Sequence, residues 1–313
     1  MKSDHDNVRL VVEEDRISRL PDELIHKILS CFDIKVAVQT CVLSSRWKLL
    51  WTSMPFLNFS NVKVPDLCSF AKFVTHVLCG LNHQIHVSSV KLDFKGAANE
   101  DFGIALCGDL FSKCVNLKNL TLKRFTIKGV DVFDIIAPRL SNLRLINSSC
   151  SKVINIIAPQ LENLTVDNCR IKCLNGPSGL PCLCYRGYRP TPLSKDGLRS
   201  LNKVDICLSM YFSPILYKEG DARKIIDMLQ NLHSAKYLTL NADIVECISS
   251  FPDLLLEHPS PFNNLISLTV DSSMREFPHK VKMSTEARNF LLNNSPSATL
   301  RMIYSYIHNT SHA

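Results

Sequence analysis

The sequence predicts an α/β chain, in which three short N-terminal helices precede a solenoid of stacked βα units with a curved parallel sheet. Three observations support this fold class. Apolar residues recur at helical spacing over the first sixty residues. A short apolar pattern returns eight times between residues 87 and 270, and a hydrophobic content of 46% in 313 residues is enough for a sizeable core.

Composition argues against several classes of protein. No apolar run approaches the roughly 18–20 residues that cross a bilayer, and Met1–Arg16 lacks the apolar segment of a secretory signal. The 13 cysteines, an odd number, then indicate reduced thiols in the cytoplasm, the nucleus or both. The net charge of +7 is spread along the chain without a block of Lys and Arg, so we expect neither nucleic acid nor membrane as a partner.

Residues 15–60 are predicted to form three short helices, after a flexible tail over residues 1–14. Pro21 suits the first turn of the first helix, the second runs through Val36 and Val38, and Ser44 or Ser45 can cap the third. Apolar residues exceed the needs of one buried stripe. Because three helices in about 45 residues make a marginal core, either a partner covers the surplus or the helices pack as a cap on the rest of the chain.

The order of residues in this module resembles the F-box. The matching segments are Leu20-Pro21-Asp22-Glu23-Leu24, Ile28-Leu29-Ser30, Ala37-Val38 and Val42-Leu43-Ser44-Ser45-Arg46-Trp47, followed by Trp51. Both ends of the module are similar to the large plant family of F-box/leucine-rich-repeat proteins. The segment Cys31–Lys35 departs from the family pattern because it lacks the usual proline, so the resemblance does not define the turn between the first two helices.

The resemblance implies that the module binds the Skp-type adaptor of an SCF (Skp–cullin–F-box) ubiquitin ligase and, through it, a cullin. Leu20 and Pro21 would lie in the contact itself. The full set that would supply the contact surface and the packing beneath it is Leu20, Pro21, Leu24, Ile28, Val38, Leu43 and Trp47. For any one of these residues, Trp47 especially, core packing alone is the competing interpretation.

A helix is expected over residues 65–81, within a linking segment that covers residues 61–86. Beyond it the pattern L-x-x-L-x-L recurs, with apolar substitutes, at eight places beginning at residues 87, 117, 140, 161, 180, 201, 235 and 265. This is the leucine-rich-repeat signature, and repeats of this kind bury their apolar face only by stacking into a curved parallel sheet. A βα domain with coincidental leucines is the alternative.

The spacing of the repeats predicts what lies on the outer side of the solenoid. The longer intervals leave room for helices over Glu100–Phe111 and Ala222–Leu232, whereas the middle intervals are expected to hold turns or a single helical turn. The solenoid is assigned to residues 87–273. Residues 274–313 are predicted to cap it with a helix over Thr285–Leu292 and a final strand within Ala298–Ile307.

Side chains beside the core leucines should face the inner surface of the arc, where a client protein would bind. This set contains Lys91, Asp93, Thr121, Lys123, Arg144, Thr165, Asp167, Cys184, Arg186, Asp205, Tyr237, Thr239, Asn241, Thr269 and Asp271. Its mixed charge suits a protein better than a polyanion. The strongest client-binding candidates are Lys123, Arg144, Asp167, Arg186, Asp205 and Tyr237. Lys123, Arg144 and Arg186 are either a basic strip for acidic or phosphorylated segments or part of a solvated face.

No motif indicates catalysis, so we expect neither an enzyme nor a bound cofactor. Cys169, Cys173, Cys182 and Cys184 fall close together, but Cys182-x-Cys184 is too closely spaced for a structural zinc site and would point both thiols to the same face of a strand. The pattern and the resemblance together predict the substrate-recognition adaptor of an SCF-type ligase. The alternatives are a binding scaffold outside the ligase and a small-molecule co-receptor, which would require a dense Arg/Lys cluster on the inner face.

Overall fold

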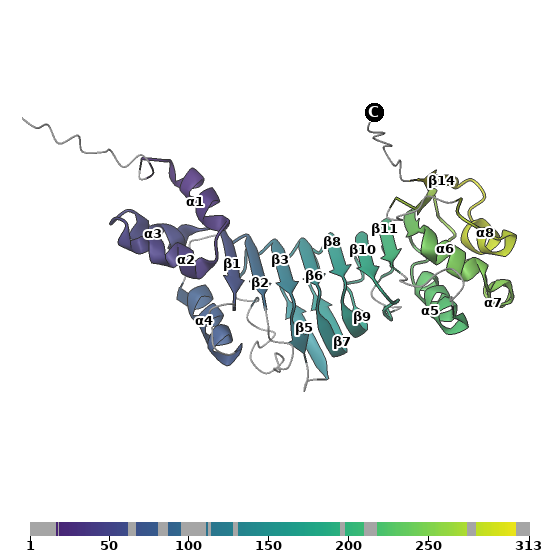
Figure 1. The fold of residues 1–313 in the computed structure, drawn as a ribbon, viewed down its shortest axis with the longest axis horizontal. Helices are drawn as coiled ribbons and strands as arrows, with labels where there is room; N and C mark the ends of the chain where they lie inside the picture. Colours follow the sequence, from purple (N-terminus) through teal and green to yellow (C-terminus); the bar gives the residue numbers. More distant parts are fainter. Residues whose placement is uncertain are drawn as a thin grey trace, which may run out of the picture.

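The computed structural model describes residues 17, 19–61, 67–80, 87–94, 111, 114–127, 131–194, 198–209, 218–273 and 280–304. The tail assigned to residues 1–14 and all but the last residue of the helix expected over Glu100–Phe111 lie outside these residues. The described part is mixed α/β, as the sequence predicts. Four α-helices lie at one end, a long parallel sheet runs through the middle, and a second group of helices lies at the other end (Figure 1).

The N-terminal module contains the three expected helices, α1 (Asp22–Ser30), α2 (Ile34–Gln39) and α3 (Trp47–Leu50), with short 3-10 helices η1 (Thr40–Val42) and η2 (Trp51–Ser53). The turn that departs from the family pattern is defined by Asp33, whose carboxylate accepts a hydrogen bond from the Lys35 N–H at 2.8 Å and caps α2. Of the two serines that could cap the third helix, Ser44 accepts the Trp47 N–H at 3.4 Å.

Ten parallel strands form the main sheet in the order β1-β2-β3-β6-β8-β10-β11-β12-β13-β14. The strands are β1 (Phe56–Ser60), β2 (Ser89–Asp93), β3 (Asn119–Lys123), β6 (Asn142–Ile146), β8 (Asn163–Asp167), β10 (Cys182–Gly187), β11 (Lys203–Leu208), β12 (Tyr237–Asn241), β13 (Ser267–Asp271) and β14 (Thr299–Ile303). Eight of them follow the eight repeats, and β14 is the expected final strand. The sequence analysis missed β1, where Met54, Leu57 and Phe59 replace the leucines.

Alternation of burial along each strand defines the core. In β3, Leu120 and Leu122 are buried, whereas the residues between and beside them are half-exposed. Equivalent residues pair in register across neighbouring strands, so that Leu120 lies beside Val90 on one side and Leu143 on the other. One face of the sheet therefore consists of stacked apolar side chains, and the opposite face, here called the inner face, carries polar ones.

The outer side of the middle repeats differs from the prediction. In place of turns or a helical turn, it holds a second parallel sheet of β4 (Thr126–Ile127), β5 (Val132–Ile136), β7 (Ser149–Ile157) and β9 (Arg170–Asn175). Alternate residues of these strands, including Ile135, Ile154 and Leu174, are buried in the same core as the leucines of the main sheet. A helix rises only about 1.5 Å per residue, so segments this short cannot cross the outer side as a helix. A strand rises about 3.3 Å per residue and covers the same distance with fewer residues.

Helices replace this second sheet toward both ends of the solenoid. The expected linking helix is α4 (Leu67–Gly80), whose Phe70 packs edge-to-face on Phe94 with ring centroids 5.3 Å apart. The helix expected near Ala222 is α5 (Glu219–Gln230), and the helix expected after Ser284 is α8 (Thr285–Leu292). Two further helices, α6 (Ala242–Ser249) and α7 (Pro252–Leu256), complete the C-terminal group (Figure 1).

Candidate protein-binding surfaces

Helix α1 carries two apolar stripes, of which one is buried and the other is exposed. Ile25 and Leu29 are buried, whereas Leu24 and Ile28, one position earlier in each turn, are 44% and 43% exposed. Residues four apart lie on the same face of a helix, so Leu24 and Ile28 form a continuous exposed stripe. Because Ile25 and Leu29 already fill the interior, this second stripe is surplus to the internal packing of the module.

More exposed apolar residues lie on the same small module. Val42 is 88% exposed and Leu43 is 63% exposed around the end of η1, and Phe32 is 47% exposed after α1. Single exposed apolar residues are ordinary on a protein surface, but this many on three short helices indicate an interaction surface. We name Leu24, Ile28, Phe32, Val42 and Leu43 together the adaptor face, after the partner that the resemblance implies.

The remaining residues that the resemblance implicates in adaptor binding lie beside or beneath this surface. Pro21 is exposed at the start of α1, and Leu20 and Val38 are half-buried against the core. Trp47 is only 4% exposed, so its side chain belongs to the packing beneath the surface. The seven residues thus divide into four exposed side chains, two at the margin and one in the interior.

Two polar side chains that the sequence analysis did not single out hold the helices together. The Arg46 guanidinium donates to the Leu20 carbonyl at 2.7 Å and forms an ion pair with Asp22, which joins the start of α1 to the segment before α3. His26 Nε2 lies 3.1 Å from the Leu50 carbonyl and 3.0 Å from Ser53 Oγ. Arg46 belongs to the resemblance motif, which was the signal available for it, but no local pattern marks His26.

The N-terminal module is also continuous with the arc. Strand β1 leads directly out of η2 and pairs with β2 from Phe56↔Ser89 to Ser60↔Asp93. Buried residues of α1, α2 and α3 belong to the same hydrophobic cluster as the leucines of the sheet. The helices therefore pack on the rest of the chain, and they still leave an apolar face exposed.

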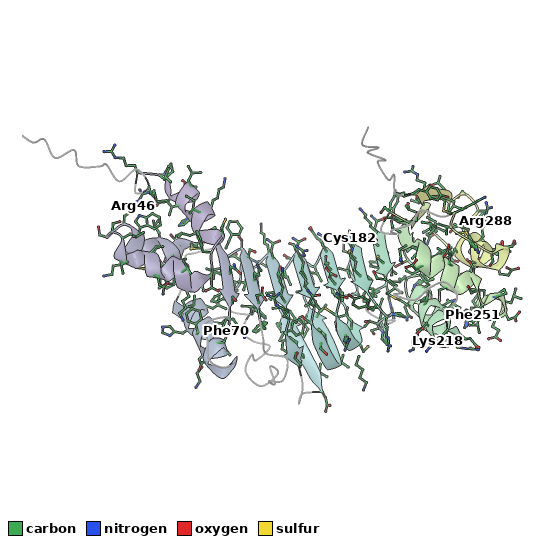
Figure 2. The ribbon with its side chains drawn as sticks, viewed as in Figure 1. Arg46, Phe70, Cys182, Lys218, Phe251 and Arg288 are labelled. Carbon is green, nitrogen blue, oxygen red and sulfur yellow. The ribbon has the colours of Figure 1, made fainter. Side chains whose placement is uncertain are left out.

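The inner face of the arc arranges its polar side chains in rows across the strands. Five of the six client-binding candidates share two of these rows: Arg144 and Asp205 lie in one, and Lys123, Asp167 and Arg186 lie in the next. Tyr237, the sixth candidate, is 44% exposed at the start of β12. The register thus gives all six candidates a place on one surface. Side chains project from the strands along the whole length of the sheet (Figure 2).

The basic strip expected from Lys123, Arg144 and Arg186 is interrupted. Arg186 lies in register with Asp167 and forms an ion pair with Asp205 at 3.7 Å. Burial raises the pKa of the neighbouring Cys184 and Cys207 thiols, so both remain protonated near neutral pH and are poor metal ligands and nucleophiles. Among the described residues, no group of three or more His, Cys, Asp and Glu side chains is placed to hold a metal ion.

Asparagine side chains form a ladder along one edge of this face. Asn163 Nδ2 donates to Asn142 Oδ1 at 2.8 Å, and Asn142 Nδ2 donates to Asn119 Oδ1 at 2.9 Å. Each asparagine directly precedes the first buried leucine of its strand. Its recurrence at one position in three repeats was a signal that the sequence analysis did not use.

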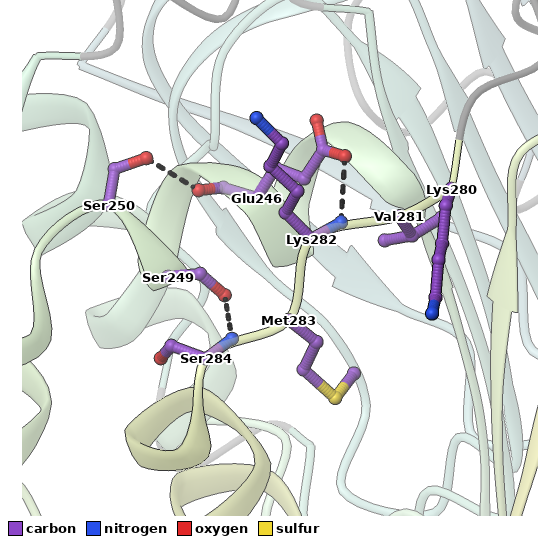
Figure 3. Close-up of a pocket in the computed structure, with 8 residues that line it drawn as sticks. All are labelled: Glu246, Ser249, Ser250, Lys280, Val281, Lys282, Met283 and Ser284. Carbon is purple, nitrogen blue, oxygen red and sulfur yellow. Dashed lines mark hydrogen bonds between the residues drawn. The ribbon is translucent and has the colours of Figure 1, made fainter.

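A pocket of about 650 Å³ lies at the C-terminal end, between α6 and residues 280–284. Its polar groups hold these two segments together (Figure 3). The buried Glu246 carboxylate accepts the Lys282 N–H at 3.0 Å, and Ser249 Oγ accepts the Ser284 N–H at 3.1 Å. These contacts give the pocket a structural role in attaching the segment before α8.

No described helix has the length and apolar character of a bilayer-spanning segment.

Comparison with known proteins matches residues 17–59 to the F-box domain. An F-box/LRR-repeat protein of Arabidopsis thaliana is 37% identical over 120 residues, which cover 36% of this chain and 32% of that protein. A putative F-box/FBD/LRR-repeat protein of the same plant is 28% identical over 262 residues, 79% of this chain and 58% of its own length. An Arabidopsis F-box protein is 23% identical over 316 residues, covering 81% of this chain and 77% of the relative. This chain thus spans between a third and four-fifths of these relatives.

Proposed function

From an F-box domain at residues 17–59, fused to a leucine-rich-repeat arc and related to plant F-box/LRR-repeat proteins, we propose that this chain is the substrate-recognition adaptor of an SCF-type ubiquitin ligase. In this proposal the adaptor face binds a Skp-type adaptor and, through it, a cullin. The inner face of the arc binds a protein client through residues that include Lys123, Arg144, Asp167, Arg186, Asp205 and Tyr237. The ligase then transfers ubiquitin to a client held at high effective concentration.

The observation that carries the proposal is the exposed apolar stripe of α1 together with η1. No residue in the described part of the chain covers the exposed faces of Leu24, Ile28 and Leu43, and covering them with a helical partner would remove this apolar surface from water. The buried Ile25, Leu29 and Trp47 hold the backbone of the stripe in place, so the face is preorganised for docking.

We expect adaptor binding to depend on this stripe. Replacing Leu24→Ala together with Ile28→Ala should weaken binding to a recombinant plant Skp-type adaptor by at least about 2 kcal/mol, or roughly 30-fold in Kd, the scale of an interface hot spot. The double variant Leu20→Ala with Pro21→Ala should have an effect of similar size, because both residues adjoin the stripe. Isothermal titration calorimetry measures both.

The matched control is Leu256→Ala, since Leu256 is 75% exposed on α7 at the far end of the molecule. It should bind the adaptor as wild type does. Circular dichroism melts separate loss of binding from loss of folding. Affinity of the Leu24/Ile28 variant within twofold of wild type would contradict the assignment of the adaptor face.

A further inference from the structure

Three cationic side chains lie on adjacent strands at the N-terminal half of the inner face. They are Lys91 on β2, Lys123 on β3 and Arg144 on β6, and together they are here called the cation triangle. All three occupy strand positions that point away from the buried leucines, and Arg144 is exposed. The sequence places all three on the inner face but includes only Lys123 and Arg144 among the strongest client-binding candidates. The strand register brings Lys91 beside them.

The register fixes the geometry of the triangle. Lys91 pairs with Thr121 on β3, and Thr121 pairs with Arg144 on β6. Strands are about 4.8 Å apart, so the Cα atoms of Lys91 and Arg144 lie about 10 Å apart with the Thr121 hydroxyl between them. Lys123 is two residues along β3, about 7 Å from Thr121 on the same face. Three cations and one hydroxyl donor thus surround one patch of the sheet.

The carboxylates nearest the triangle are those of Asp93, in register with Lys123, and of Asp167 on β8, one strand beyond Arg144. None of the three cations forms a hydrogen bond or ion pair with another residue that the structure describes. Asp93, which pairs in register with Lys123, is bound instead by the Arg124 guanidinium, and its side chain is only 12% exposed. On the other side Lys123 faces the buried Ile146.

Carboxylates enter this face on β8, the strand next to Arg144, and the face carries both signs of charge from there on. Asp167, Asp205 and Asp271 lie on β8, β11 and β13, and the next cation, Arg186, already pairs with Asp205. A long polyanion laid across the strands would meet these carboxylates, whereas a short acidic stretch covers only the triangle. The pattern therefore favours a peptide with local negative charge over a nucleic acid.

We propose that the cation triangle is the docking site for an acidic segment of the client protein. Side-chain carboxylates of consecutive Asp or Glu residues accept hydrogen bonds from Lys91, Lys123, Arg144 and the Thr121 hydroxyl, with the guanidinium able to bind one carboxylate through two N–H groups. The inference rests on the proposed function only in taking the inner face of the arc as the client-binding surface.

The test uses the full chain and three probes, which are a fluorescent decapeptide rich in Asp and Glu, the same peptide with Asn and Gln in their place, and a ten-nucleotide single-stranded DNA. Fluorescence anisotropy is measured for wild type, for the triangle variant and for a control of equal charge change at the C-terminal half of the sheet. The triangle variant is Lys91→Gln, Lys123→Gln, Arg144→Gln, and the control is Lys203→Gln, Lys236→Gln, Arg301→Gln.

We expect wild type and control to bind the acidic peptide in preference to the amide peptide, and the triangle variant to bind it at least tenfold more weakly. The proposal is overturned by any of three results: wild type does not distinguish the two peptides, both variants lose affinity equally, or the DNA binds more tightly than the acidic peptide. Adaptor affinity measured on the same variants should be unchanged. An adaptor that fails to bind wild type would defeat the ligase assignment without altering the peptide result.

Discussion

At the scale of single residues, the turns after β6 and β8 are each held by a small buried side chain that bonds to the backbone. Ser148 Oγ donates to the Ile146 carbonyl at 2.7 Å, and Cys169 Sγ occupies the equivalent place one repeat later, 3.3 Å from the Asp167 carbonyl. Ile146 and Asp167 pair in register, so the two turns stack. Cys169 is therefore a structural residue of the repeat, as its spacing after Val166 indicates.

Burial of this thiol makes stability depend on alkaline pH. Desolvation raises the pKa of Cys169 from 9.0 to about 11. Below pH 9 the thiol is protonated in both states, but between pH 9 and 11 only the unfolded thiol ionises, so the free energy of unfolding falls as pH rises. Replacing Cys169→Ser should remove up to about 2–3 kcal/mol of this loss at pH 11.

Urea denaturation at pH 8, 9, 10 and 11 measures the effect. Other buried thiols, including Cys247 with a pKa of about 12, are present in both proteins and cancel in the comparison. Cys31→Ser makes the same substitution at an exposed position and serves as the control for the exchange itself. Parallel stability curves for wild type and Cys169→Ser across this range would contradict the explanation.

At the scale of elements, the sequence is most informative where side-chain periodicity alone decides the structure. The leucine pattern predicts the inner strands because burial on one face requires alternation. Burial also alternates in the outer strands, as in β7, where Ile154 and Ile156 are buried and Ile157 is exposed. Four of the five residues Val153-Ile154-Asn155-Ile156-Ile157 are apolar, so the sequence itself does not show this alternation. Strand β1 was not predicted because its residues lie inside the segment that resembles the F-box, and that segment was expected to be helical throughout.

The candidate surfaces were predictable to different degrees. The exposed positions Leu24, Ile28 and Leu43 follow from the F-box resemblance, which also includes Trp47 without distinguishing its buried role. The links made by His26 join residues more than twenty positions apart, so no local pattern predicts them. Likewise, Arg186 does not join Lys123 and Arg144 in one basic strip, because the carboxylates of Asp167 and Asp205 lie beside it. These residues come together only when the strands pair in the folded chain.

Strand β7 provides a test of the outer sheet within one element. Ile154 is fully buried, whereas Ile157 is 44% exposed on the same strand. Ile154→Ala should lower the free energy of unfolding by about 2–5 kcal/mol, because it leaves a cavity between the two sheets. Ile157→Ala, which removes the same atoms from a partly solvated position, should cost less than about 1 kcal/mol. Chemical denaturation measures both, and equal losses would contradict the alternating strand.

At the scale of the whole molecule, β1 makes the adaptor face and the arc one continuous body. Phe59 is fully buried in β1, pairs in register with Leu92 of β2 and packs edge-to-face on Phe73 of α4, with ring centroids 6.1 Å apart. In the proposed complex, the orientation of the arc relative to the adaptor would then be set by packing instead of by a linker. A client held on β2–β6 would lie at a fixed distance from the ligase.

This continuity predicts which parts of the molecule lose local stability when a buried residue is replaced. Because each repeat of a solenoid contacts only its neighbours, the loss of local stability from Phe59→Ala, about 3–5 kcal/mol, should remain near the N-terminal end. Amide hydrogen exchange should therefore accelerate in α1, β1 and β2 and stay near its wild-type rate in β12 and β13. Phe290→Ala, at a buried residue of α8, should give the opposite pattern. Faster exchange in α1 without any change in β2 would mean that the helices and the arc are energetically separate, and client and adaptor would then be joined by a hinge.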